Sequence, residues 1–413
     1  MADIKPFKAY RPTKDKVGRV SALPYDVFSR KEAYEEVKKN PDSFLAIDRP
    51  ETQFAEDYDM YAPEVYQKAH DMLWGQIESG VFEQDETNCY YIYEQTMNGR
   101  TQTGIVACAS IDDYLNNVIK KHENTRAEKE EDRIKHVYTC EAQTGPIFLC
   151  YRNNKMLSDL VAKIKEVDEP VYDFTSDDGV KNRVWIISDL EETETVCRVF
   201  ATIDSIYIAD GHHRCASAVK VGLRKREEND GKARGKQQYD YFLSVLFPDN
   251  ELMIMDYNRV MHDKNGMSLD EIINKASEYF EIKEYGTDAY KPASKGTFGM
   301  YADKKWYELK IKDEFKSDDP VDGLDVSILQ KYMLDGLLGI KDPKTDKRIE
   351  FVGGIRGLKE LETRADKYDG LAFSMYPTSI GELFAVADAG RLMPPKSTWF
   401  EPKLRSGIFI HLI

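Results

Sequence analysis

The chain has 413 residues, a formal net charge of −15 and a pI near 5.1. This excess of acid argues against a non-specific nucleic-acid binder, whose surface would be basic, and 41% hydrophobic residues argue against disorder. No apolar run reaches membrane-spanning length and the six cysteines form no Cys-x-x-Cys pair, so we expect a cytoplasmic protein with reduced thiols and no membrane contact.

The first part of the chain alternates helical and strand patterns. Ser29 and Glu32 form the sequence signature of a capping box, which predicts a helix directly after Ser29. Apolar residues at a helical period predict a second helix over 61–79. Two β-prone runs then flank Asn98-Gly99, a pair that favours the type I′ turn of a hairpin.

The segment after this hairpin carries the first residues with chemical potential. His122 and Glu123 stand at a break before a highly charged helix predicted over 127–136. A Glu and a His side by side supply the groups needed to remove a hydroxyl proton, although the pair also suits a surface turn. Thr125 is suited to capping the helix or contacting phosphate, and Arg126 to binding a ligand or facing solvent.

The most informative stretch is 206–218, whose pattern predicts a strand, a tight turn and a helix. The turn region consists of Asp210, Gly211, His212, His213 and Arg214. A helix N-terminus favours an anion, glycine lets the backbone approach a ligand, and arginine can bind two phosphate oxygens at once. These residues predict a phosphate site. The alternatives are a buried turn with structural histidines and, since adjacent histidines point in divergent directions, a less favoured metal site.

The second half of the chain contains further predicted strands and helices. The run 241–247 predicts a core strand, and the run 253–260 predicts another that ends near Asn258 and Arg259. The glycine-rich segment 351–357 lacks the spacing of either nucleotide-binding glycine motif, so it is expected to be a tight connection.

Two later helices and an irregular tail complete the pattern. Ser268 and Ser379, each followed by Glu three residues later, predict capped helices. The tail 393–407 is held by prolines and carries Lys396, Ser397 and Lys403, which suits a second phosphate group.

Several segments together resemble one large bacterial and archaeal family. The loop Asp210–Arg214 also resembles the phosphate loop of the ParB/sulfiredoxin-like superfamily. The matching segments are Pro24–Asp26, His122–Thr125, Asp210–Arg214, Tyr257–Arg259 and Met393–Gly407. The family is related to the free serine kinases of that superfamily, and some members phosphorylate L-serine with pyrophosphate. The resemblance implies a mixed α/β (α+β) fold with a ParB/sulfiredoxin-like core and additions at both ends.

The resemblance also implies roles for the site residues. It implies Glu123 as the base for an L-serine hydroxyl, assisted by His122 and His213, to give O-phosphoserine. The loop 211–214 would hold the phosphates of pyrophosphate, ADP or ATP. Tyr25, Asp26, Thr125 and Arg126 would contact the substrate, while Arg259, Lys396, Ser397 and Lys403 would bind phosphate. Magnesium is expected as a helper, with Asp210 or Asp26 as a possible ligand.

Two other functions remain open from the sequence. A phosphoserine phosphatase would use much the same site in reverse, and a non-catalytic nucleotide-binding regulator would need the loop but not Glu123. The expected organisation is an N-terminal α/β part over 1–110, a ParB/sulfiredoxin-like core over 111–265 and a C-terminal α/β part over 266–413 whose tail returns to the site.

Overall fold

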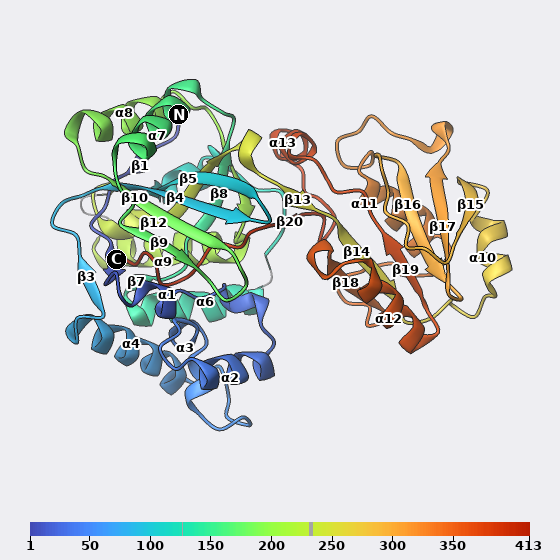
Figure 1. Cartoon of the computed structure of the whole chain (residues 1–413), viewed down its shortest axis with the longest axis horizontal. Coiled ribbons are helices and arrows are strands. Elements are labelled where there is room, and N and C mark those ends of the chain that lie inside the picture. Colours follow the sequence, from blue (N-terminus) through green and yellow to red (C-terminus); the bar gives the residue numbers. More distant parts are fainter. Residues whose placement is uncertain (126, 231–233) are drawn as a thin grey trace. The chain divides into compact units, whose positions relative to one another are not determined.

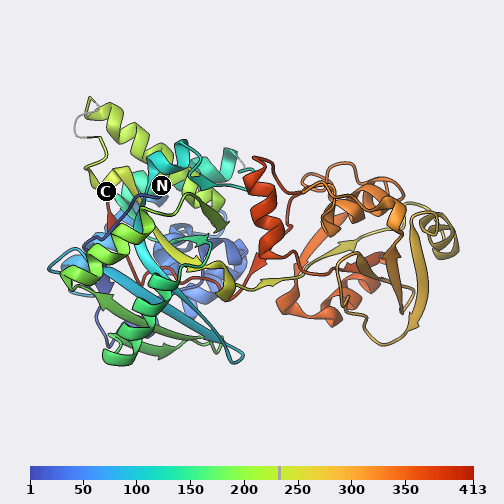
Figure 2. The ribbon, with the colours of Figure 1, turned by 90° about the horizontal axis from the view of Figure 1, so that it is seen from above.

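A computed structural model describes residues 1–125, 127–230 and 234–413. It has a mixed α/β fold, as predicted, and contains two compact units (Figures 1 and 2). The first unit comprises 1–252 and 402–413, and the second comprises 253–401. The expected domain boundaries near 110 and 265 differ from the limits of these two units and remain predictions. The ParB/sulfiredoxin-like core also remains a prediction.

A nine-stranded mixed sheet forms the centre of the first unit. Its strands run in the order β6 (Ile119–Lys120), β11 (Ile206–Asp210), β8 (Ile147–Tyr151), β12 (Tyr241–Pro248), β5 (Arg100–Ser110), β4 (Tyr90–Met97), β10 (Lys181–Ile187) and β9 (Tyr172–Thr175), with β1 (Ile4–Lys5) beside β5. Strand β11 is parallel to β6 and antiparallel to β8. The predicted hairpin is confirmed as β4 and β5, because Asn98 and Gly99 have φ of 52° and 78° at its turn.

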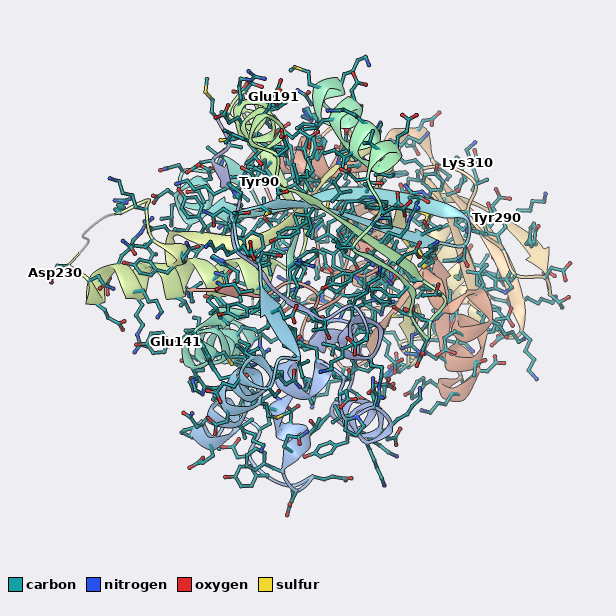
Figure 3. All side chains as sticks on the ribbon, turned by 60° about the vertical axis from the view of Figure 1, so that its left-hand side comes forward. Tyr90, Glu141, Glu191, Asp230, Tyr290 and Lys310 are labelled. Carbon is teal, nitrogen blue, oxygen red and sulfur yellow. The ribbon has the colours of Figure 1, made fainter. Side chains whose placement is uncertain are left out.

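Helices surround this sheet on the first unit. They are α1 (Val17–Val20), α2 (Arg30–Lys39), α3 (Leu45–Asp48), α4 (Pro63–Glu78), α5 (Ile111–Leu115), α6 (Ala127–Cys140), α7 (Lys155–Val167), α8 (Leu190–Phe200) and α9 (His212–Glu228). The capping box of α2 forms as predicted. Helix α9 packs against β8 and β12 and also against α6. Figure 3 marks the ends of these two helices, with Glu141 directly after α6 and Asp230 shortly after α9.

Short strand pairs connect the terminal segments of the chain to the rest of the first unit. They are β2 (Tyr10–Pro12) with β3 (Phe82–Gln84), and β7 (Ala142–Gln143) with β21 (His411–Leu412). A β-bridge joins Ala22 to Ser406, and another joins Tyr10 to Ile410. The tail is therefore built into the core of this unit, and Phe409 and Ile410 are fully buried.

The second unit, by itself, is a six-stranded sheet with helices. The strand order is β15 (Phe280–Gly286), β17 (Lys305–Ile311), β16 (Thr297–Ala302), β19 (Leu371–Ser374), β14 (Tyr257–Met261) and β18 (Ile349–Gly353), with β13 (Ile254–Met255) paired to β20 (Trp399–Phe400). Its helices are α10 (Leu269–Ala276), α11 (Asp325–Leu329), α12 (Leu358–Tyr368) and α13 (Ile380–Asp388). The capping boxes predicted for α10 and α13 are confirmed. None of the helices in the described residues is long and apolar enough to cross a membrane.

Candidate functional site

The predicted strand, turn and helix at 206–218 are confirmed as β11, Gly211 and α9. Gly211 has φ of 88°, a left-handed conformation that turns the strand directly into the helix. The helix therefore begins at His212, earlier than the predicted start after Arg214, and the motif residues make up its first turn. Gly211 has no side chain to cap the helix, and the N-terminus of such a helix favours an anion through its N–H groups and its dipole.

Asp210 at the end of β11 is surrounded by cations. Its Oδ2 lies 3.2 Å from Nζ of Lys403 and 3.9 Å from Nη2 of Arg214, while its Oδ1 accepts the backbone N–H of Gly211 at 2.9 Å. Burial disfavours the charged carboxylate, but Lys403 and Arg214 outweigh that effect and hold the pKa of Asp210 well below its usual value. Asp210 thus holds two cations beside the N-terminus of α9, where both can attract an anionic ligand.

Arg214 covers the glycine turn. Its Nη1 donates to the carbonyl of Pro146 at 2.7 Å, and its Nε is buried without a hydrogen-bond partner among the described residues. A Cβ on Gly211 would lie 3.1 Å from Nε and from Nη2 of Arg214. The glycine therefore provides the space for the guanidinium as well as the backbone conformation, and the Arg214 guanidinium has unused donor capacity.

The histidines nearest the turn are buried and neutral. The His122 and His212 rings meet edge to face with centroids 4.5 Å apart, and only 1% and 7% of the two residues are exposed. Burial lowers the pKa of His122 to about 4 and the pKa of His212 well below its usual value. At neutral pH His122 is thus a poor proton acceptor, so the stronger candidate for a base is its neighbour Glu123, half-buried in the bend after β6.

The other expected substrate and catalytic residues lie around the start of α6 and on α9. Thr125 donates to Oε2 of Glu130 at 2.7 Å, and Lys220 forms an ion pair with the same carboxylate. The charge of His213 acts on Glu130 as well, which places it on the side of α9 that faces α6. Arg126 lies outside the described residues.

Tyr25 and Asp26 lie on one short turn but in different surroundings. Tyr25 is near Arg133 and Arg214, and burial raises the pKa of its hydroxyl to about 12. Asp26 is exposed and borders a neighbouring pocket. Only Tyr25 therefore approaches the phosphate loop itself.

The second unit holds the remaining predicted phosphate residues. Arg259 is 3% exposed and donates to the carbonyl groups of Tyr257 and, at 3.1 Å, Lys396. Burial lowers the pKa of Arg259 to about 10, and no carboxylate among the described residues pairs with it. Ser397 is buried and donates to the carbonyl of Pro394 at 2.6 Å. The structure thus brings Arg259, Lys396 and Ser397 together within this unit.

The expected magnesium ligands do not form a metal site in this arrangement. The described residues contain no group of three or more His, Cys, Asp or Glu side chains placed to hold a metal ion. Asp210 instead has Lys403 and Arg214 as neighbours, and such cations repel a metal ion. The residues therefore do not fit a protein-bound magnesium at Asp210.

A pocket that the sequence did not indicate adjoins Arg214. Its empty space is about 450 Å³, including open solvent. The polar residues that line it are Tyr25, Asp48, Arg133, His136, Gln143, Thr144, Arg214 and Ser406. A Cβ on Gly145 would lie 3.1 Å from Oγ of Ser406, so glycine keeps one wall open. A charged helix pattern gave no sign that Arg133 is buried, because such runs usually face solvent.

Comparisons with known proteins add a family. A family described as protein of unknown function (DUF1015) matches residues 4–327. No curated protein matches the sequence.

Solved structures with some similarity are all distant. A free serine kinase in complex with AMP has 14% identity and a TM-score of 0.34, covering 74% of this chain and 91% of that chain. A conserved hypothetical protein from Pyrococcus furiosus has 15% identity and a TM-score of 0.34, with coverages of 75% and 95%. C-terminally truncated SbnI from Staphylococcus aureus has 10% identity and a TM-score of 0.35, with coverages of 72% and 82%.

Proposed function

The chain belongs to the DUF1015 family, and we propose that it is a phosphotransferase that acts on the hydroxyl group of a small substrate. The observation that carries this proposal is the start of α9, where Arg214 and Lys403 flank Asp210 at a helix N-terminus that Gly211 leaves without a side-chain cap. Phosphoryl transfer depends mainly on positioning and on positive charge around the transferred group. A strand end, a glycine turn and a long helix supply both from rigid elements.

The loop is the proposed holder of the donor phosphates. The N–H groups of the first turn of α9 bind phosphate oxygens, and Arg214 and Lys403 neutralise their charge. Lys403 would exchange part of its contact with Asp210 for the incoming phosphate. Arg259, Lys396 and Ser397 are proposed as phosphate-binding residues of the second unit.

The proposed acceptor is L-serine, and the proposed base is Glu123. Glu123 takes the proton of the serine hydroxyl while the hydroxyl oxygen forms a bond to phosphorus. The bond between phosphorus and the bridging oxygen of the donor breaks, and phosphate or the shortened nucleotide leaves. His122 stays neutral beside Glu123, and His213 is proposed to assist. The products are O-phosphoserine and the leaving group, with the proton passed to that group or to solvent.

The proposed donor is pyrophosphate or a nucleotide such as ADP or ATP. Any magnesium would enter on the donor's own phosphate oxygens, because Asp210 already faces two cations. The roles assigned to the protein groups require no metal ion held by the chain.

A screen of donors against acceptors tests the proposal. Purified protein is incubated with L-serine and pyrophosphate, ADP or ATP, with and without Mg²⁺, and O-phosphoserine is measured by mass spectrometry. We expect product with at least one donor and none with the Glu123→Gln variant. Folded protein that gives no product with any donor would overturn the proposal. In a separate incubation with O-phosphoserine alone, release of L-serine and phosphate would indicate the phosphatase instead.

A further inference from the structure

The pocket beside Arg214 contains a buried carboxylate that forms no ion pair with a cationic side chain of the described residues. Asp48 ends α3 and is 3% exposed. Its Oδ1 accepts a hydrogen bond from Oγ1 of Thr144 at 2.8 Å, and no Lys, Arg or His nitrogen of the described residues lies within ion-pair distance of it. A buried carboxylate is costly unless it is paired, so a cationic group in the pocket would stabilise this one.

The arginine beside Asp48 is already hydrogen-bonded to other groups, although its charge also acts on the Asp48 carboxylate. Arg133 directs Nε and Nη2 to the carboxylate of Asp132, both at 2.9 Å, and Nη1 to the backbone carbonyl of Asp48 at 3.2 Å. Its guanidinium carbon lies 4.2 Å from the centre of the Tyr25 ring. Arg133 is thus held by Asp132, and it acts on the Asp48 carboxylate through its charge without forming an ion pair with it.

The pocket therefore has two electrostatic ends. Asp48 and Thr144 offer oxygen atoms to a donor group, while Arg214 at the other wall has an unpaired buried Nε. The charges of Arg133 and Arg214 act on the hydroxyl of Tyr25, as do those of Asp26 and Asp132, so this tyrosine lies near both arginines. A ligand that is cationic at one end and anionic at the other matches this distribution of charge.

We propose that this pocket binds a small α-amino acid, with its ammonium group on Asp48 and its carboxylate toward Arg214 and Tyr25. The proposal rests on the proposed phosphotransferase function, since it makes this pocket the acceptor subsite beside the phosphate loop. Asp48 is then the residue that selects an amino acid over other small alcohols. A buried ionic contact of this kind discriminates strongly, because a ligand that lacks the charge leaves Asp48 unpaired.

Calorimetric binding to the full chain tests this without any need for turnover. The ligands are L-serine, 3-hydroxypropanoate, which lacks the ammonium group, and ethanolamine, which lacks the carboxylate. We expect L-serine to bind about 10- to 100-fold more tightly than either analogue. Equal binding of 3-hydroxypropanoate and L-serine to the wild-type protein would overturn the proposal, and this comparison does not depend on a variant that folds.

Asp48→Asn identifies the residue responsible. We expect the variant to lose about 10- to 100-fold in L-serine affinity and to keep 3-hydroxypropanoate affinity within about twofold. Asp42→Asn is the matched control, because Asp42 is a surface carboxylate paired with Arg19 at 2.8 Å. If L-serine binding depends on Asp48 but no phosphoryl transfer is detected, the amino-acid pocket is supported and the proposed phosphotransferase function is contradicted. If Asp48→Asn leaves phosphoserine formation unchanged, the proposed role of this pocket is contradicted and the phosphotransferase function is not.

Discussion

Two turns of this chain look alike locally and differ in their surroundings. One joins β11 to α9 through Gly211, and the other leads from β18 to α12 through Gly357. Both glycines precede the helix with positive φ, 88° and 76°, and both turns carry an arginine, Arg214 and Arg356. Arg214 is nearly buried over its glycine, whereas Arg356 is exposed and a Cβ on Gly357 would meet no atom within 4 Å.

The difference shows that a glycine turn before a helix is not by itself a phosphate site. The first turn gathers a carboxylate, two cations and two buried histidines from three separate segments. The second turn has the carboxylate of Asp256 beside Gly354, but its own arginine is exposed, as expected for a tight connection between elements. Chemistry at such a turn is thus determined by what the rest of the fold brings to it.

The largest expected effect comes from the base next to the first turn. Glu123→Gln should lower turnover of L-serine by about 10²- to 10⁴-fold, because the amide keeps the shape but accepts no proton at neutral pH. Donor affinity should stay near the wild-type value. The control is Glu360→Gln in the first turn of α12, which should leave turnover unchanged. Wild-type turnover in Glu123→Gln would show that the base is a different residue.

Acid should destabilise the first unit through its buried histidines. The folded state holds the pKa of His122 near 4, whereas the unfolded chain has the ordinary value of about 6.5, so the unfolded state binds more protons between these values. Stability is therefore lost as pH falls from 6.5 to 4, by about 3 kcal/mol for this residue.

Urea unfolding at pH 7 and at pH 4.5 measures this loss. His122→Gln should show a smaller difference between the two pH values than the wild type, because it removes one of the titrating groups. His70→Gln, which removes a half-exposed ring, is the control. An unchanged pH dependence in His122→Gln would mean that His122 titrates normally in the folded protein.

Arginine substitutions at the two turns distinguish the proposed phosphate site at Gly211 from the locally similar turn at Gly357. Arg214→Ala should weaken binding of pyrophosphate or nucleotide by about 10- to 100-fold, because a charge-assisted contact is lost. Arg356→Ala should leave donor affinity unchanged. Isothermal titration calorimetry measures both, and equal effects of the two substitutions would remove the distinction between the turns.

Glycine substitutions should give the smallest effect on donor binding. Gly211→Ala should cost about 1–2 kcal/mol of stability through its left-handed φ, and Gly357→Ala about 1–3 kcal/mol through its extended positive φ. Only Gly211→Ala should also weaken donor binding, by a few-fold, since its Cβ would press on Arg214. Thermal unfolding with and without pyrophosphate compares the two, and a weakened donor affinity in Gly357→Ala would contradict this expectation.

Local rules predicted much of the secondary structure. Capping boxes at Ser29, Ser268 and Ser379 and the turn at Asn98-Gly99 depend on neighbouring residues, so the sequence contains all the information they need. The start of α9 was predicted too late, because Gly211 bends the chain more sharply than composition suggests.

The candidate site was harder to predict, because its parts are distant in sequence. The loop 210–214 carries its own signal, but the pocket residues Asp48, Arg133 and Thr144 look like ordinary surface or turn residues until the fold buries them. Asp48 is the last residue of a short, otherwise apolar helix, and no periodic pattern marks a single buried carboxylate. Such residues are found only through tertiary packing.

The partner of Asp210 lies 193 residues further along the chain, beyond the whole of the second unit. A ribosome adds about 5–20 residues per second, so roughly 10–40 s separate the synthesis of Asp210 from that of Lys403. During that time the nascent first unit lacks Lys403 and the buried segment around Phe409. The sheet of the first unit is therefore incompletely covered until the C-terminal tail has been translated. During this interval chaperones and proteases can act on the exposed part of the sheet.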